Sequence, residues 1–252
     1  MKLVFALLPI LLTTAPALAE PTSVTVHAIS QDAKFIGDSM GGVEVVLRDA
    51  KTGKELAKGL TAGDTGDTHK IMEAVGRSPM RTSPGAAHYS TTLDISVPTL
   101  VRVELRGPLG RPLTMQSAMS DRWLVPGISA VAGNAWVVEL PGLAIEVDGI
   151  SNLTQGQSTT LTAKVSLMCG CPITDGGLWD AADYQVVAIL RHKGQPSEQT
   201  RLSFVATPGQ FSATLTPSFS GKGELWITAR NKRTGNTGVA RLPIKSSNTK
   251  TR

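Results

Sequence analysis

The stretch "GQFSATLTPSFSGKGELWITARNKRTGNTGVARLPIK", residues 209–245, alternates apolar and polar residues over three short segments. The connections between these segments are rich in Gly, Pro, Ser and Asn. An alternation with a period of two predicts strands with one buried face, and these connecting residues predict turns. The stretch therefore predicts three successive strands of an antiparallel β-sandwich.

The same alternation recurs along most of the chain. It is interrupted by turn residues, and the 252 residues include 25 Gly and 15 Pro. The best helical segment is 67–75, which Asp67 or Thr68 can cap, and it lies within a long irregular stretch at 61–88. The chain is therefore predicted to be all-β. Further alternating segments span 23–29, 43–49, 99–107, 158–167, 184–192 and 200–206.

The C-terminal half resembles a bacterial immunoglobulin-like module. "GQFSATL" (209–215) has the pattern G-x-[FY]-x-A-x-L, and "GELWITA" (223–229) has the pattern G-x-[LYW]-x-[IV]-x-A that follows it in such modules. The resemblance covers residues 150–246, and "GGVEVVLRDAKTGKELAKGLT" (41–61) is similar to the same broad class. It implies two tandem immunoglobulin-like β-sandwich domains, and it implies a fold rather than a chemistry.

The ends of the chain predict export. Lys2 precedes an apolar run, and "ALA" (17–19) is a small-x-small cleavage signal, so we expect removal of the first 19 residues. No later segment is apolar enough to span a membrane, which places the mature protein in the periplasm or outside the cell. The expected divisions are a signal peptide (1–19), an N-terminal domain (20–144), a C-terminal domain (145–246) and a disordered basic tail (247–252).

Composition argues against two classes of function. The net charge of +5 is modest, aromatic residues make up 4% of the chain, and no basic run is dense, which argues against nucleic-acid binding. The chain has no G-x-S-x-G, HExxH or phosphate-cradling glycine motif, and its four histidines are dispersed. We therefore expect no enzymatic activity, and no cofactor other than copper is suggested.

The two cysteines, Cys169 and Cys171, leave three interpretations open. An exported pair of thiols is expected to form a disulfide, although a bridge between residues i and i+2 closes a very small ring. With Met168, and with His192 as a further ligand, the thiolates would suit Cu(I). The third interpretation is a redox or intermolecular dithiol, although C-x-C differs from the usual C-x-x-C spacing.

Two loops rich in aspartate are candidate binding loops. Neither has the spacing of a known calcium loop, so turn and helix-cap chemistry is favoured over a cation site. The candidate residues are Asp64, Asp67 and His69 in the first loop and Asp175, Trp179 and Asp180 in the second.

The sequence thus predicts an exported, non-enzymatic binding or accessory protein of the cell envelope. Recognition of another envelope protein is expected through the loops at 61–85 and 168–183, because sandwiches present loops at their ends. The alternative is a copper-handling or thiol-redox accessory protein that uses "MCGC" (168–171).

Overall fold

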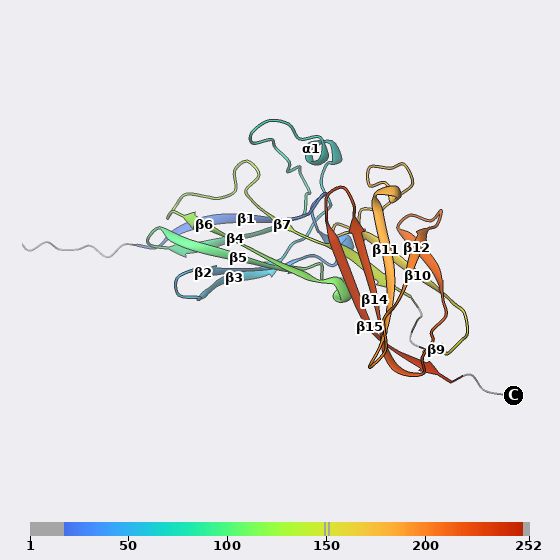
Figure 1. Cartoon of the computed structure of the whole chain (residues 1–252). Helices are drawn as coiled ribbons and strands as arrows, with labels where there is room; N and C mark the ends of the chain where they lie inside the picture. Colours follow the sequence, from blue (N-terminus) through green and yellow to red (C-terminus); the bar gives the residue numbers. More distant parts are fainter. Residues whose placement is uncertain (1–17, 149, 151, 249–252) are drawn as a thin grey trace, which may run out of the picture.

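The N-terminal part of the chain is a sandwich of two small sheets (Figure 1). The computed structural model describes residues 18–148, 150 and 152–248. One sheet has the order β4-β1-β7 and the other β3-β2-β5-β6, and β1 pairs with β4 antiparallel and with β7 parallel. The strands are β1 (Glu20–Ser30), β2 (Glu44–Asp49), β3 (Glu55–Leu60), β4 (Tyr89–Ile95), β5 (Thr99–Gly107), β6 (Gln116–Leu124) and β7 (Trp136–Leu140).

The C-terminal part contains eight strands in one continuous order, β8-β10-β13-β12-β11-β14-β15-β9. The pairing between β12 and β13 is short and joins only two residue pairs. The strands on either side of this short pairing bury their apolar residues in a shared core. The strands are β8 (Leu143–Val147), β9 (Asn152–Thr154), β10 (Thr159–Leu167), β11 (Tyr184–His192), β12 (Glu198–Phe204), β13 (Gln210–Leu215), β14 (Gly221–Asn231) and β15 (Thr237–Ser247).

The chain is therefore an all-β protein with two tandem immunoglobulin-like β-sandwich domains, as the sequence predicts. All nine alternating segments are strands, and their inward residues are buried in alternation, as in β14. Within the described part of the chain, helix is restricted to short pieces between strands: η1 (Asp38–Met40), α1 (Thr68–Met72), η2 (Pro112–Thr114) and η3 (Ala181–Asp183).

The predicted helix in the 61–88 stretch is confirmed but is shorter than expected. The Asp67 side chain accepts a hydrogen bond from the Lys70 backbone N–H at 2.9 Å, so Asp67 is the cap. The helix ends at Met72, where Glu73 leaves the helical conformation, rather than at Gly76. The stretch around it is ordered by bridges that pair Ala62 with His88 and Asp64 with Ala86.

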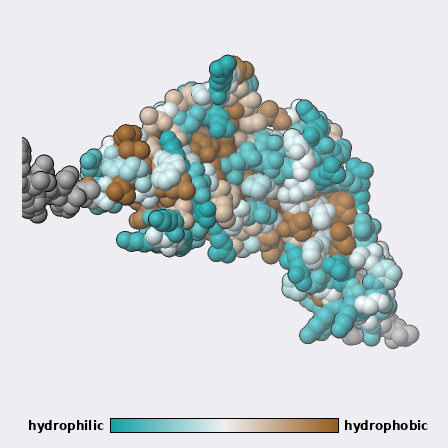
Figure 2. All heavy atoms as spheres, turned by 60° about the vertical axis from the view of Figure 1, so that its left-hand side comes forward, coloured by the Kyte–Doolittle hydropathy of each residue, from teal (hydrophilic) through white to brown (hydrophobic). Residues whose placement is uncertain are grey.

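The structure describes only part of the two predicted terminal segments, the signal peptide and the basic tail. Nearly all of the predicted signal peptide, residues 1–17, lies outside the described residues. Strand β15 runs to Ser247, one residue into the predicted basic tail, and residues 249–252 also lie outside the described part. Among the described residues, no helix has the length and apolar character needed to cross a membrane. Figure 2 shows one face that is mostly hydrophilic and carries separate apolar patches.

The two sandwiches share one continuous core at their junction. Most of the buried apolar residues of both belong to one apolar cluster. The Met168 backbone N–H donates to Ser30 Oγ (3.1 Å), and the buried Asn236 side chain bonds both backbone groups of Gly142. A side chain at Gly170 would come within 2.9 Å of Met40 Sδ, so the "CGC" turn packs directly against the N-terminal sandwich.

His27 should make the fold sensitive to acid. It is buried, its Nδ1–H donates to the Ala87 carbonyl oxygen (2.8 Å), and burial lowers its pKa below 6.5. Below that pH the unfolded chain binds a proton that the folded chain resists, so the free energy of unfolding falls as the pH drops. We expect the melting temperature to fall between neutral pH and about pH 5, and His27→Gln to flatten this dependence.

The control for this pH dependence is the exposed His69, whose pKa is raised by the Glu73 carboxylate. The His69→Gln variant should keep the acid sensitivity of the parent protein. Thermal melts of the three proteins across the pH range measure the effect, and an unchanged slope in His27→Gln would contradict the assignment.

Candidate binding site at the domain junction

Three segments that are distant in sequence meet around a pocket at the domain junction. They are α1, the loop that precedes β11, and the turn between β14 and β15, which lie on the upper side of Figure 1. The pocket has a volume of about 250 Å³. Residues from all three segments line it, together with one residue after β1: Asp32, Met72, Leu178, Trp179, Asp183, Asn231, Arg233 and Thr234.

Hydrogen bonds across the junction hold the walls of this pocket. The Trp179 indole N–H donates to the Asp32 carbonyl oxygen (2.9 Å), and the Thr234 hydroxyl donates to the Asp32 carboxylate. Arg233 forms an ion pair with Asp183 at 3.2 Å. Contacts from both sandwiches therefore fix the relative positions of the loops.

The rim of the pocket combines apolar surface with one arginine, Arg233, and two aspartates, Asp32 and Asp183. Leu178 is 60% exposed and directly precedes the half-buried Trp179. Arg233 has a side chain that is 77% exposed despite its ion pair. A partner that places an apolar side chain on Leu178 and a hydrogen-bond acceptor on the exposed guanidinium of Arg233 would match this rim.

The candidate aspartates mostly close turns. Asp64 accepts from the Gly66 backbone N–H (2.7 Å), and Asp180 accepts from the Gly176 and Ala182 backbone N–H groups (3.2 and 3.0 Å). Asp175 is exposed. No group of three or more His, Cys, Asp or Glu side chains with metal-binding geometry occurs among the described residues.

The cysteines form a buried disulfide at the junction. Cys169 and Cys171 are bonded to each other, with their Cα atoms 5.4 Å apart. Gly170 between them has φ = +80°, which favours glycine, and its backbone N–H donates to the Leu167 carbonyl oxygen at 2.8 Å. Thiolates rather than disulfides ligate Cu(I), so copper binding at Met168, Cys169 and Cys171 would require the reduced pair. Copper binding here stays a prediction from the sequence.

The structure does not bring His192 to the cysteine stretch. Strand β11 begins at Tyr184, beside the junction loop that carries the cysteines, and His192 is its last residue. Eight residue steps separate the two ends of β11, which amounts to about 26 Å. His192 lies instead beside a groove on the outer face of the C-terminal sheet.

That groove contains residues that sequence analysis did not single out. Alternation within each strand already places Arg191, Trp226 and Arg241 on the face opposite the core. Their proximity depends on the pairing register, which sets Trp226 directly opposite Arg241 and Arg191 opposite Glu224. Strand alternation was the available signal, but the register could not be deduced from it.

No family model and no curated protein matches this chain. Among solved structures, it is similar to fibronectin(III)-like modules of Clostridium thermocellum CbhA, with 9% identity, a TM-score of 0.29, and coverage of 93% of this chain and 95% of that chain. It is also similar to the chicken interferon gamma receptor alpha chain, with 9% identity, a TM-score of 0.32, and coverage of 93% and 100%. These likenesses are weak, and no function is transferred from them.

Proposed function

We propose that this protein is an exported, non-enzymatic binding or accessory protein of the cell envelope that recognises another envelope protein through its junction loops. The observation that carries the proposal is the convergence of α1, the loop before β11 and the β14–β15 turn around the exposed Leu178. Loops held by a rigid scaffold are common recognition surfaces.

The scaffold beneath these loops supports such a role. In this proposal the first domain ends with β7 at Leu140 and the second begins with β8 at Leu143, within a few residues of the boundary at 144/145 that the sequence predicts. Hydrogen bonds from Trp179 and Thr234 to Asp32 tie the loops of the second domain to the first. A binding surface built from both domains therefore loses little conformational entropy when a partner docks.

A photo-crosslinking residue at position 178 tests this function in the native envelope. We expect one discrete adduct, and we expect Arg233→Glu to weaken its formation about tenfold, because the substitution reverses the charge at position 233 and breaks the ion pair with Asp183. The control position is Lys164, which is exposed on β10. Adducts formed equally from positions 164 and 178, or an adduct indifferent to Arg233→Glu, would count against the proposal.

A further inference from the structure

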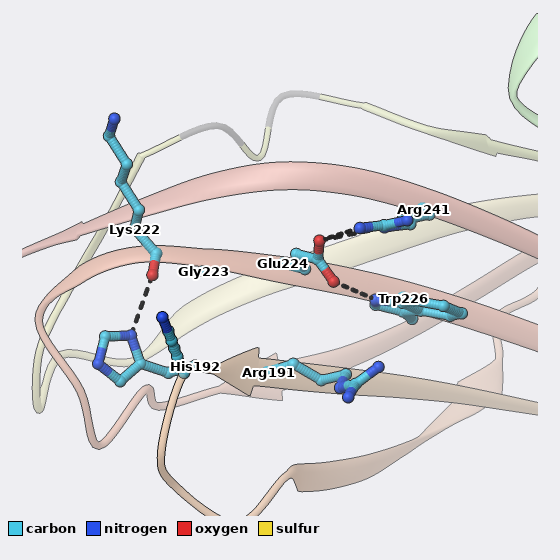
Figure 3. Close-up of a pocket in the computed structure, with 8 residues that line it drawn as sticks. Arg191, His192, Lys222, Gly223, Glu224, Trp226 and Arg241 are labelled. Carbon is cyan, nitrogen blue, oxygen red and sulfur yellow. Dashed lines mark hydrogen bonds and ion pairs between the residues drawn. The ribbon is translucent and has the colours of Figure 1, made fainter.

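A groove of about 660 Å³ crosses the outer face of β11, β14 and β15, on a surface separate from the junction loops (Figure 3). In this view Arg191, Glu224, Trp226 and Arg241 lie to the right, at one end of the groove, and His192 and Lys222 lie to the left, at the other end. The side chains come from three neighbouring strands because the register aligns them across the sheet.

The groove is strongly cationic. Four cationic side chains line it, namely Arg191, Lys193, Lys222 and Arg241, and they are opposed by the single carboxylate of Glu224. Its net charge is therefore +3, without counting His192. Among the described residues, no carboxylate lies within ion-pair distance of Arg191, Lys193 or Lys222, although all three are exposed.

The one carboxylate is already committed to other groups. Glu224 forms an ion pair with Arg241 and accepts a hydrogen bond from the Trp226 indole N–H at 3.0 Å. These two contacts, with Arg241 the stronger, lower the pKa of Glu224, so it is ionised at neutral pH. Glu224 orients the Arg241 and Trp226 side chains. Its charge also acts on Arg191 across the paired strands without an ion pair, and Lys193 and Lys222 have no ion-pair partner among the described residues.

Several groups in the groove are held in place before any ligand arrives. The guanidinium carbons of Arg191 and Arg241 lie 5.4 and 5.2 Å from the centre of the Trp226 ring, within cation–π range. His192 Nδ1–H donates to the Lys222 carbonyl oxygen (3.0 Å), and its ring stacks on Phe219 at 4.8 Å. Fixed donors lose less conformational entropy on binding than mobile ones.

We propose that this groove binds a ligand that carries at least two phosphate groups, such as a diphosphate or a longer condensed phosphate. A single carboxylate would neutralise only one of the three excess charges. A phosphate group carries about −1.5 to −2 at neutral pH, so two neighbouring groups match the charge of the groove. The fork of Arg191 can bind phosphate oxygens in pairs, while Lys193 and Lys222 act as point charges.

Isothermal titration calorimetry of the full chain with inorganic tripolyphosphate tests the proposal. We expect saturable binding that weakens with ionic strength, and binding of inorganic phosphate that is at least about tenfold weaker. The double variant Lys193→Gln/Lys222→Gln should weaken tripolyphosphate binding about tenfold or more. Both lysines are exposed, so the variant is expected to fold, and Arg191→Gln provides a second variant on the other side of the groove.

The matched control is Lys164→Gln/Arg201→Gln, which removes the same charge from exposed positions outside the groove. Absence of tripolyphosphate binding, or equal loss in the control, would overturn the proposal. Vesicles containing a lipid diphosphate distinguish the source of the ligand. Retention that depends on Lys222 would support a lipid-borne phosphate, and tripolyphosphate binding without retention would support a soluble one.

Discussion

The Asn236→Ala variant should lower the free energy of unfolding by about 2–4 kcal/mol. Asn236 is 3% exposed, and its side chain binds Gly142 twice. Its Oδ1 accepts from the Gly142 backbone N–H (2.9 Å), and its Nδ2 donates to the Gly142 carbonyl oxygen (3.1 Å). Gly142 is buried between β7 and β8, so truncation leaves two buried backbone groups without a partner.

Urea unfolding of the parent and variant proteins measures this effect. Asn236→Asp keeps the acceptor and loses the donor, while adding a buried charge, so it should also destabilise the fold. The exposed Gln199 on β12 offers a matched amide control, and Gln199→Ala should change stability by less than about 0.5 kcal/mol. If Asn236→Ala is no less stable than Gln199→Ala, water replaces the two hydrogen bonds to Gly142, and the stability of the junction does not depend on the Asn236 side chain.

The strands could be predicted from the sequence where one face of the strand is buried. In β14 the residues Leu225, Ile227 and Ala229 are buried and their neighbours are not, so burial follows the alternation in the sequence. Strand β6 was not predicted because it lies at the edge of its sheet and exposes both Met119 and Trp123. An edge strand with few buried residues lacks the period-two signal.

The candidate site could be predicted less completely, because it depends on contacts between the two domains. The sequence identified the loops that carry Trp179 and Asp180, but it could not show that Trp179 bonds Asp32 from the other sandwich. The disulfide between Cys169 and Cys171 is similar in this respect, because Met40 covers its turn from the first domain. Alternation and turn residues describe local structure and contain no information about such pairs.

The second large effect is expected for Phe35→Ala, which should cost about 3–5 kcal/mol. Phe35 is fully buried in a small apolar cluster beneath the 61–88 stretch. Its backbone N–H donates to the Thr65 carbonyl oxygen (3.2 Å), and its ring lies 5.0 Å from the His27 ring. The other buried residues of this cluster are Ile29, Ile71, Ala86 and Ala87.

Because this cluster lies beneath α1, Phe35→Ala should also change the local stability of α1, and not only the free energy of unfolding of the whole domain. Ile71 is the buried residue of α1 and packs in this cluster. A five-residue helix has negligible stability by itself, so α1 depends on such packing. Loss of the Phe35 ring should therefore speed hydrogen exchange at the α1 amides before the sandwich opens. Because Met72 lines the junction pocket, the same variant should also weaken crosslinking from position 178.

Phe204 offers a matched comparison for the Phe35→Ala variant. It is only partly buried, it lies on β12, and its ring contacts Phe211 edge-on at 5.5 Å. Phe204→Ala deletes the same atoms, should cost less, and should leave hydrogen exchange in α1 unchanged. Equal exchange rates in α1 for Phe35→Ala and the parent protein would show that the loop holds its shape without the cluster, and the binding surface would then be independent of the core beneath it.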